Sequence, residues 1–311
     1  MNYYLWDLKL LNNNFKSGFI TIIGEPNVGK STLLNTIIGH KIAIMSNKPQ
    51  TTRNKILGVY TTDDAQIIFT DTPGIHNPHD ALGEFMNDSS FNSVKGVDYI
   101  FYMVSAVSRI NDLNQKIIEK LKNTKKPIYL IINKIDLLKK KSDIDKVVAS
   151  YTKELNFAGV YPISALEKTT IDILIGDIKE KLPEGPKYYP DDMISDHPER
   201  FIIGELIREK ILELTREEIP HSVAITVDSL KKIDEDMVEI FATIYVERQS
   251  QKKIIIVEGG KLIKEIKRRA KKDINSLLGS HSVLDLWVKV KEDWKNRKDV
   301  LRTLGYSKDN Y

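Results

Sequence analysis

The chain has 311 residues, 41% of them hydrophobic and 29% charged, which is ordinary for a globular protein with room for two domains. It contains no cysteine, which excludes disulfides, thiolate zinc sites and cysteine nucleophiles. The net charge of +4 is unevenly distributed, because residues 252–273 hold nine Lys or Arg and only three Asp or Glu. The apolar stretch near residues 99–107 is too short to span a bilayer, and the N-terminal sequence does not resemble a signal peptide.

The first 182 residues divide into a short start and an alternating pattern. Residues 1–16 are expected to form an N-terminal extension. From residue 17 to 182, apolar β-branched runs alternate with helical patterns. The expected strands are 18–23, 66–71, 98–104 and 127–132, and the expected helices are 31–38, 111–121, 143–155 and 171–181. Because these strands are apolar on both faces, they predict an α/β fold with a mostly parallel sheet, which binds ligands at the carboxyl ends of its strands.

The composition changes after residue 182. Residues 183–199 contain four prolines and read as a linker. Residues 200–311 predict an α+β domain with an amphipathic helix at 201–214 and a second helix at 262–278. Its expected strands are 223–229, 238–246, 253–257 and 284–290.

A glycine-rich sequence, GEPNVGKS, follows the first expected strand and opens a helix. This is the context of a phosphate-binding P-loop, where glycines let backbone N–H groups approach the phosphates and the helix N-terminus favours an anion. Lys30 is expected to reach the β- and γ-phosphates, and the Ser31 hydroxyl to bind Mg²⁺. The alternative is an ordinary glycine turn before a helix. The predicted phosphate-binding residues are Gly24, Glu25, Pro26, Asn27, Val28, Gly29, Lys30, Ser31 and Thr32.

Two further segments extend this phosphate site. The sequence Asp71-Thr72-Pro73-Gly74 follows the second expected strand, so Asp71 can hold Mg²⁺ through water and the Gly74 N–H can meet the γ-phosphate. Between the two motifs lies Gln50-Thr51-Thr52-Arg53, where a threonine, Thr52 in preference to Thr51, can complete the Mg²⁺ shell only while a γ-phosphate is present. The alternatives are a common turn and a solvated polar loop. Lys30, Thr52 and Gly74 are the predicted catalytic residues, and Ser31, Thr52 and Asp71 the Mg²⁺ ligands.

The base is predicted from Asn133-Lys134-Ile135-Asp136, which follows another strand. The Asp136 carboxylate can accept hydrogen bonds from guanine N1–H and the 2-amino group, which adenine lacks. Asn133 would brace the loop and approach N7, while the Lys134 stem covers the ring. Later in the chain, Ser164 and Ala165 complete the site, with the Ala165 N–H expected to donate to guanine O6.

The basic segment of the C-terminal third predicts a second binding surface. A glycine pair opens a helix whose apolar stripe leaves its basic residues outside. Such a helix start can clamp a nucleic-acid backbone, although a solvated basic face is the alternative. The candidate RNA-binding residues are Gly259, Gly260, Lys261, Lys264, Lys267 and Arg268. Trp287 and Trp294 are expected to be packing anchors, with base stacking as the alternative for an exposed one.

The ordered motifs of residues 18–182 place the chain with the Ras-like GTPases. The phrases PNVGKSTLLN, QTTR, DTPGIH, NKID, PISAL, KYYPDD, FIIGELIREK, LWVKVKEDW and LRTLGY resemble the bacterial Era GTPase family over nearly the whole chain. This resemblance implies GTP hydrolysis with Mg²⁺ and a C-terminal KH domain that binds the 3′ end of small-subunit ribosomal RNA. It also implies assistance in 30S subunit assembly and a cytoplasmic location with some peripheral membrane association. The protein is expected to be a monomer.

Two positions depart from common patterns. The family's G-x-x-G falls on residues 257–260, where Val257 replaces the first glycine and the turn is expected either to move to Gly259–Gly260 or to clamp less well. Ile75 stands where Ras-like enzymes carry a water-orienting glutamine, so intrinsic hydrolysis is expected to be slow. Several of the GTPases that this chain resembles use K⁺ held by an asparagine that corresponds to Asn27. The alternative is that Asn27 only supports the loop by hydrogen bonding to its backbone. Arg53 is an unsupported candidate for an arginine finger. The alternative functions are a tRNA-modifying GTPase and a binding module with a vestigial nucleotide site.

Overall fold

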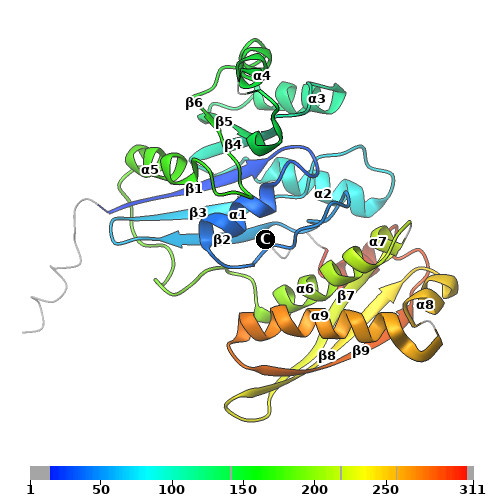
Figure 1. Ribbon diagram of the computed structural model, residues 1–311. Coiled ribbons are helices and arrows are strands. Elements are labelled where there is room, and N and C mark those ends of the chain that lie inside the picture. The colour runs from blue at the N-terminus through cyan, green and yellow to red at the C-terminus, as the bar shows by residue number, and fades with distance from the viewer. Residues whose placement is uncertain (1–14, 141, 218, 257, 307–311) are drawn as a thin grey trace, which may run out of the picture.

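The computed structural model describes residues 15–306 except 141, 218 and 257, and it contains two units packed against each other (Figure 1). The N-terminal unit is built on a six-stranded sheet with the order β2-β3-β1-β4-β5-β6. All neighbouring strands are parallel except β2, which runs antiparallel to β3. The strands are β1 Lys16–Ile23, β2 Ile56–Thr61, β3 Ala65–Asp71, β4 Tyr99–Ser105, β5 Ile128–Asn133 and β6 Gly159–Pro162.

Helices cover both faces of this sheet, which confirms the predicted α/β class. One apolar core lies between the sheet and α1 and α5, and a second lies on the opposite face under α3 and α4. The sequence pattern had not indicated α2, which begins after Asp80, whose side chain accepts a hydrogen bond from the Gly83 N–H at 2.8 Å. The helices are α1 Lys30–Ile38, α2 Ala81–Asn92, α3 Asp112–Leu121, α4 Asp143–Thr152 and α5 Ile171–Lys181.

The proline-rich segment after α5 runs along the N-terminal unit. The Gly185 N–H donates to the Phe15 carbonyl, and the Ser195 hydroxyl donates to the Leu57 carbonyl at 2.6 Å. The Gln66 amide oxygen accepts hydrogen bonds from the N–H groups of Tyr188 and Tyr189. These bonds fix where the second unit begins relative to the sheet.

The C-terminal unit has a three-stranded sheet with the order β7-β8-β9, in which β8 is antiparallel to β7 and parallel to β9. The helices α6 and α9 pack on one face of this sheet and enclose its core. The elements are α6 Glu199–Leu214, α7 Ile219–Ser222, β7 Ala224–Lys232, β8 Met237–Val246, α8 Gln249–Ile256, α9 Lys261–Leu278, β9 His281–Val290 and α10 Lys298–Thr303.

One predicted strand of this unit is wrong. Residues 253–256 belong to helix α8, while Val257 lies outside the described residues. The Gln251 side chain accepts hydrogen bonds from the backbone N–H groups of Glu247 and Arg248, which anchors the helix start. Gln251 and Ile255, four residues apart, are both buried, whereas Ile254 is exposed. Packing at a helical spacing therefore overrides the β preference of the isoleucine run.

Helix α6 was expected to be amphipathic, but it is buried around most of its circumference. This helix of the C-terminal unit faces the N-terminal unit (Figure 1). Its charged side chains Arg208, Glu209 and Lys210 are therefore buried together with its leucines and isoleucines. Buried charges require partners, and here some of the partners come from the N-terminal unit.

Candidate functional site

The glycine-rich loop between β1 and α1 has the backbone geometry that its sequence predicts. Gly24 and Gly29 have φ values of 158° and 102°, which favour glycine. A Cβ on Gly24 would lie 2.2 Å from the Met103 carbonyl oxygen, and one on Gly29 would lie 2.3 Å from the Asn133 amide nitrogen. Neither glycine can be replaced without moving the loop, which leads directly into the N-terminus of α1 at Gly29.

Lys30, at the start of α1, extends back over the loop. Its ammonium donates to the carbonyls of Glu25 and Gly24 at 2.8 and 3.2 Å. Burial lowers the pKa of Lys30 to about 8, and the nearby charges of Asp71 and Glu25 oppose that shift. Lys30 thus remains mostly protonated at neutral pH, as binding to the β- and γ-phosphates requires.

Three oxygen-bearing side chains meet beside Lys30. The Ser31 hydroxyl donates to Asp71 Oδ2 at 2.6 Å and lies 2.9 Å from the Thr52 hydroxyl. Burial raises the pKa of Asp71 to about 6, against the opposing effect of Lys30. Asp71 Oδ1 is buried without a hydrogen-bond partner within the described residues. Hydroxyl and carboxylate oxygens with a spare acceptor suit Mg²⁺ and its bound water, so these three residues would hold the ion.

The residues predicted for the base lie at the ends of β5 and β6 and bind one another. The Ser164 hydroxyl donates to Asp136 Oδ1 at 2.6 Å, which orients the carboxylate. The Asn133 amide donates to the Val28 carbonyl at 2.8 Å, which ties the base-binding loop to the phosphate loop. Asn133 Oδ1 accepts from the Ala165 N–H at 2.9 Å, so the N–H that we assigned to guanine O6 is engaged within the protein here.

Lys134 lies between these two loops. It has φ 67°, and its ammonium donates to the Asn27 carbonyl at 2.6 Å. This contact draws its aliphatic stem along the edge of the site, where it can cover a planar ring.

A cavity of about 650 Å³ joins the phosphate and base ends. Its walls include eleven of the predicted residues, namely Pro26, Asn27, Gly29, Lys30, Ser31, Thr32, Thr52, Gly74, Asn133, Lys134 and Asp136. The other predicted residues are not part of its lining: Gly24, Glu25, Val28, Asp71, Thr72, Pro73, Ser164 and Ala165. Most of these hold the lining residues in place, as Ser164 holds Asp136 and Val28 binds Asn133.

The cavity also has walls that the sequence analysis missed. Residues 44–48 cover one side, and Leu137 and Leu166 lie at the base end. Leu212 and Glu213, at the end of α6, contribute from the C-terminal unit. Nothing in the local sequence of α6 resembles a nucleotide motif, so only its tertiary placement reveals this contribution.

The position after Gly74 lacks a group that could orient water. Ile75 is buried in the core under α3, and its N–H donates to the Gly24 carbonyl at 3.2 Å. A Cβ on Gly74 would lie 2.7 Å from Pro26 Cα, so glycine is needed for the close approach of these two loops. Gly74 lines the cavity, where its N–H could meet a γ-phosphate, but the buried Ile75 side chain cannot help to activate water.

The segment that carries Thr52 is attached to the C-terminal unit on both sides of that residue. The Arg208 guanidinium of α6 donates to the Thr51 carbonyl and is paired with Glu205. On the other side, the Arg53 guanidinium donates to the Val223 carbonyl at 2.6 Å. Arg53 lies 5.8 Å from the centre of the Trp294 ring and is directed away from the phosphate site, so it is not an arginine finger in this arrangement.

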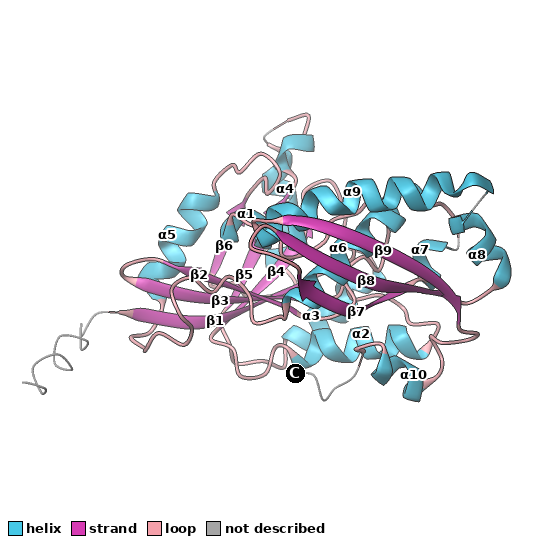
Figure 2. Ribbon diagram, turned by 90° about the horizontal axis from the view of Figure 1, so that it is seen from below, coloured by secondary structure: helices cyan, strands magenta, loops and turns pink. Residues whose placement is uncertain are grey.

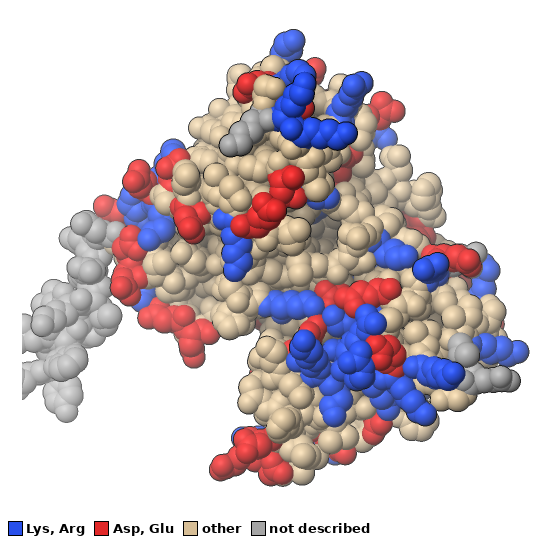
Figure 3. All heavy atoms as spheres, in the orientation of Figure 1, with Lys and Arg blue, Asp and Glu red and all other residues tan. Residues whose placement is uncertain are grey.

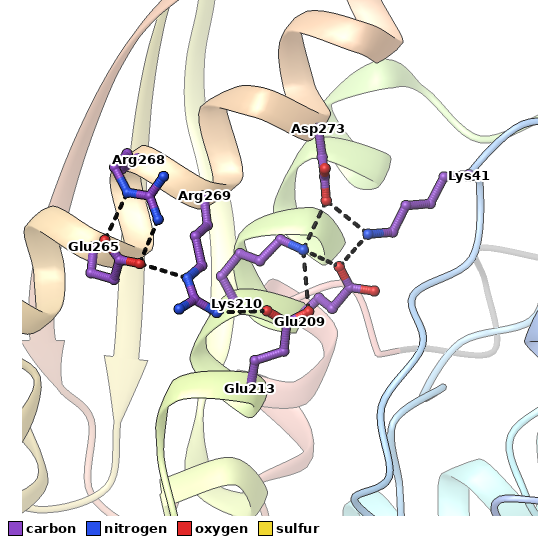
Figure 4. A network of polar contacts seen from close by, with 8 residues as sticks. All are labelled: Lys41, Glu209, Lys210, Glu213, Glu265, Arg268, Arg269 and Asp273. Carbon is purple, nitrogen blue, oxygen red and sulfur yellow. Dashed lines mark hydrogen bonds and ion pairs between the residues drawn. The ribbon is translucent and has the colours of Figure 1, made fainter.

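A charged network extends this attachment to α9 (Figure 4). Glu209 of α6 accepts from the Met45 N–H at 2.8 Å and from the Lys41 ammonium at 2.5 Å. Lys41 also pairs with Asp273 of α9 at 2.7 Å, and Lys210 pairs with both acids. The loop that follows α1 is therefore bound to both major helices of the C-terminal unit.

The start of α9 resolves where the glycine turn lies. Gly259 and Gly260 have φ values of 77° and 64°, a left-handed conformation that glycine adopts without strain. A Cβ on Gly259 would meet no atom within 4 Å, which leaves the turn open for a ligand to approach. The turn thus lies at Gly259–Gly260, one of the two predicted outcomes, while Val257 lies outside the described residues.

Basic side chains gather over α9 (Figure 3). Lys261 and Lys264 are exposed. Lys267 is paired with Asp285 of β9 at 2.8 Å, and Arg268 is paired with Glu265. The surface retains its positive charge near the glycine turn, but Lys267 and Arg268 must exchange a carboxylate for a phosphate to bind RNA.

Across the described residues, no helix has the length and apolarity needed to cross a membrane.

The fold and the site define a P-loop protein for guanine nucleotides that carries a second, basic α+β unit. Comparisons with known proteins agree. Residues 19–134 match the family model of the 50S ribosome-binding GTPase, and residues 218–295 match that of the KH domain.

Two solved structures resemble nearly the whole chain. A variant of Era from Aquifex aeolicus, bound to GDP and AlF₄⁻, is 39% identical with a TM-score of 0.91, over 94% of this chain and all of that one. An Era bound to MgGDPNP and nucleotides 1506–1542 of 16S ribosomal RNA is also 39% identical, with a TM-score of 0.90, over 94% of this chain and 99% of that one. The chain belongs to the Era family and is a GTPase with a KH domain.

Proposed function

We propose that this protein binds Mg·GTP and the 3′ end of small-subunit ribosomal RNA and acts as a switch in 30S subunit assembly. In this proposal residues 17–182 form the GTPase domain, 183–199 the linker and 200–311 the KH domain, with residues 1–16 as an extension. Family membership supports a monomer in the cytoplasm with weak peripheral membrane association.

The observation that carries the proposal is the attachment of the Thr52 segment to the KH domain. Arg208 and Glu209 of α6 bind the Thr51 carbonyl and the Met45 N–H, on either side of the segment that lines the cavity. Asp273, on the same helix as the basic surface, binds Lys41. A change in this segment on loss of the γ-phosphate would therefore act on the helix that faces RNA. The Era complex with a 16S fragment supports the identity of the RNA.

The RNA surface can be tested by replacing Lys264, Lys267 and Arg268 together with Ala. We expect weaker binding of an RNA fragment equivalent to nucleotides 1506–1542 of the relative's complex. With three fewer phosphate contacts, the variant releases fewer counterions when it binds RNA. The slope of log K against log salt should therefore fall in magnitude by about 2 for a single strand. The measurement is fluorescence anisotropy over a range of KCl concentrations.

The matched control is the triple replacement of Lys122, Lys125 and Lys126, three exposed lysines of the GTPase domain, which should leave the slope unchanged. An equal loss of slope in both triple variants would contradict the assignment to α9. Crosslinking of the purified protein in cell lysate, followed by sequencing of the bound RNA, separates ribosomal RNA from tRNA. Recovery of mainly tRNA would favour the tRNA-modifying alternative.

We also propose that K⁺ assists hydrolysis. Ile75 has no group that could orient water, and Arg53 is directed away from the phosphate site, so we assign stabilisation of the transition-state charge to a bound cation. Asn27 in the phosphate loop has φ 62°, and its amide donates to the Asn47 carbonyl at 3.1 Å. An amide oxygen and a backbone carbonyl at the same end of the cavity are suitable ligands for a hard cation.

The expected result is GTP hydrolysis at least about tenfold faster in KCl than in NaCl at equal ionic strength. Asn27→Ala should abolish this difference, while Asn92→Ala, at an exposed position on α2, should preserve it. Equal rates of the wild-type protein in both salts would rule out the ion. A potassium effect that survives in Asn27→Ala would keep the ion and remove this residue from its ligands.

A further inference from the structure

The two tryptophans of the KH domain lie in opposite environments. Trp294 is 0% exposed, and its indole N–H donates to the Ser222 carbonyl at 3.1 Å, so it is the packing anchor that was expected. Trp287, in the middle of β9, is 64% exposed, which corrects its expected role as an anchor. Tryptophan is highly buried on average, so an exposed fraction of 64% in the middle of a strand makes Trp287 a candidate for contact with a ligand.

Trp287 lies on the face of the KH sheet that is opposite α6 and α9. Leu286 and Val288 on either side of it point into the core, and alternation along the strand places Trp287 on the outer face. In Figure 2 the strands of this sheet lie on the viewer's side of the two helices. At one end the face is covered, because Tyr245 packs with the buried cluster of Trp294 and Tyr306. Next to that end the outer face is open to solvent, and there Trp287 lies opposite Thr243 of the neighbouring strand β8.

The charges around Trp287 leave a cation available. Asp285, two residues before it, is paired with Lys267, and Asp228 accepts a hydrogen bond from the Thr243 hydroxyl at 2.6 Å. Lys289, two residues after Trp287 on the same face, is exposed and has no acidic partner among residues 15–306 as described. An aromatic ring next to an available ammonium is the combination that binds a nucleotide by stacking on its base and neutralising its phosphate.

The same strand connects this face to the basic helix. β9 is an edge strand of the sheet, and the Lys267–Asp285 pair joins α9 to the outer side of β9. A backbone that follows the basic side chains of α9 and crosses this edge would reach Trp287 next. The outer face is therefore continuous with the proposed RNA surface rather than a separate patch.

We propose that Trp287 is a base-stacking site for single-stranded RNA, with Lys289 contacting the adjoining phosphate. This inference rests on the proposed RNA binding and extends the RNA path around the edge of β9. Stacking accepts any base, so the site adds affinity with little sequence preference, and it requires an unpaired nucleotide because the bases of a duplex are already stacked.

The test uses the full-length protein, in a Trp6→Phe background, and the RNA fragment equivalent to nucleotides 1506–1542. Because Trp294 is fully buried, exposed-tryptophan fluorescence then comes mainly from Trp287. We expect RNA to quench this fluorescence, and Trp287→Ala to weaken RNA binding by roughly 5- to 100-fold without changing the salt slope. Trp287→Phe should recover most of the affinity. Lys289→Ala should lower the slope by about 0.7, the share of one phosphate on a single strand.

Val283→Ala is the matched control, since Val283 is an exposed apolar residue on the same face of β9. It should bind RNA as the wild type does, and thermal melting should show each variant folded. If the wild-type protein fails to bind the fragment, the proposed function fails. If the wild type binds and Trp287→Ala binds equally well, the stacking site is overturned while the proposed function stands. If Trp287→Ala binds the RNA fragment as the wild type does but no longer binds intact 30S subunits, the face contacts a protein partner and the stacking site is also overturned.

Discussion

Replacing Asp136 with Asn should transfer the specificity of the site from guanine to xanthine nucleotides. Ser164 holds the carboxylate at 2.6 Å at the base end of the cavity. A carboxylate accepts from both N1–H and the 2-amino group of guanine, and each bond to a charged group contributes about 1.5 to 3 kcal/mol. The Asn oxygen still accepts from guanine N1–H, but its NH₂ group now faces the 2-amino group, so one bond is lost and two donors oppose each other. GTP binding should therefore weaken by roughly 10²- to 10⁴-fold. The Asn side chain can accept from xanthine N1–H and donate to its 2-oxo group, so XTP should gain affinity.

Competition among GTP, XTP and ATP for the site measures this exchange. Asp172→Asn makes the same chemical change at an exposed position of α5 and should leave the preference for GTP intact. Retention of full GTP selectivity in Asp136→Asn would show that the base is read elsewhere. Competition by ATP as strong as that by GTP in the wild-type protein would overturn the guanine assignment altogether.

Replacing Arg208 with Ala should impair the GTPase from a position in the KH domain. Arg208 is fully buried and pairs with Glu205, which is also buried. Removing one partner leaves an uncompensated buried charge, which costs about 3 to 5 kcal/mol of stability. The Thr51 carbonyl also loses its donor, so Thr52 is held less firmly beside Ser31. Because Thr52 is expected to act only when a γ-phosphate is present, GTP binding and hydrolysis should fall more than GDP binding.

A second variant separates the loss of stability from the loss of the switch contact. Arg208→Met combined with Glu205→Leu removes both charges and fills a similar volume, and such replacements are often neutral or stabilising. We expect thermal stability to recover while GTP hydrolysis stays reduced. Arg200→Ala, at an exposed position in the first turn of α6, should alter neither property. Recovery of full hydrolysis in the double variant would mean that Arg208 contributes only to stability.

The nucleotide site was largely predictable because its chemistry is local. Gly24 and Gly29 follow directly from a loop that must approach phosphates, and Ser31 and Asp71 follow from the strand ends that a parallel sheet brings together. The prediction was less complete for Ala165, whose N–H binds Asn133 in this structure. That competition depends on two loops from different strands, and no short motif encodes it.

The second domain was harder to predict, because burial there contradicts local patterns. The isoleucine run at 253–256 favours a strand by propensity but forms part of α8, where Ile255 packs into the core. Helix α6 was predicted to be amphipathic, yet its charged residues are not confined to a solvent face, and Arg208 and Glu209 are buried against the segment that carries Thr52. A charged residue is predicted to be exposed unless the fold is known, because contacts such as that from Arg208 to the Thr51 carbonyl join residues 157 positions apart.

The sequence by itself determined the α/β class, the order of the nucleotide motifs, the absence of cysteine chemistry and the position of the basic helix. Each of these depends on residue types and on short spacings along the chain, which can be recognised without knowledge of the fold. Only the tertiary structure decided that α6 forms part of the nucleotide cavity, that Arg53 is directed toward Trp294, and that Trp287 is open to solvent. These properties depend on contacts between distant segments, and contact, rather than composition, decides whether a charge is paired or a ring is covered.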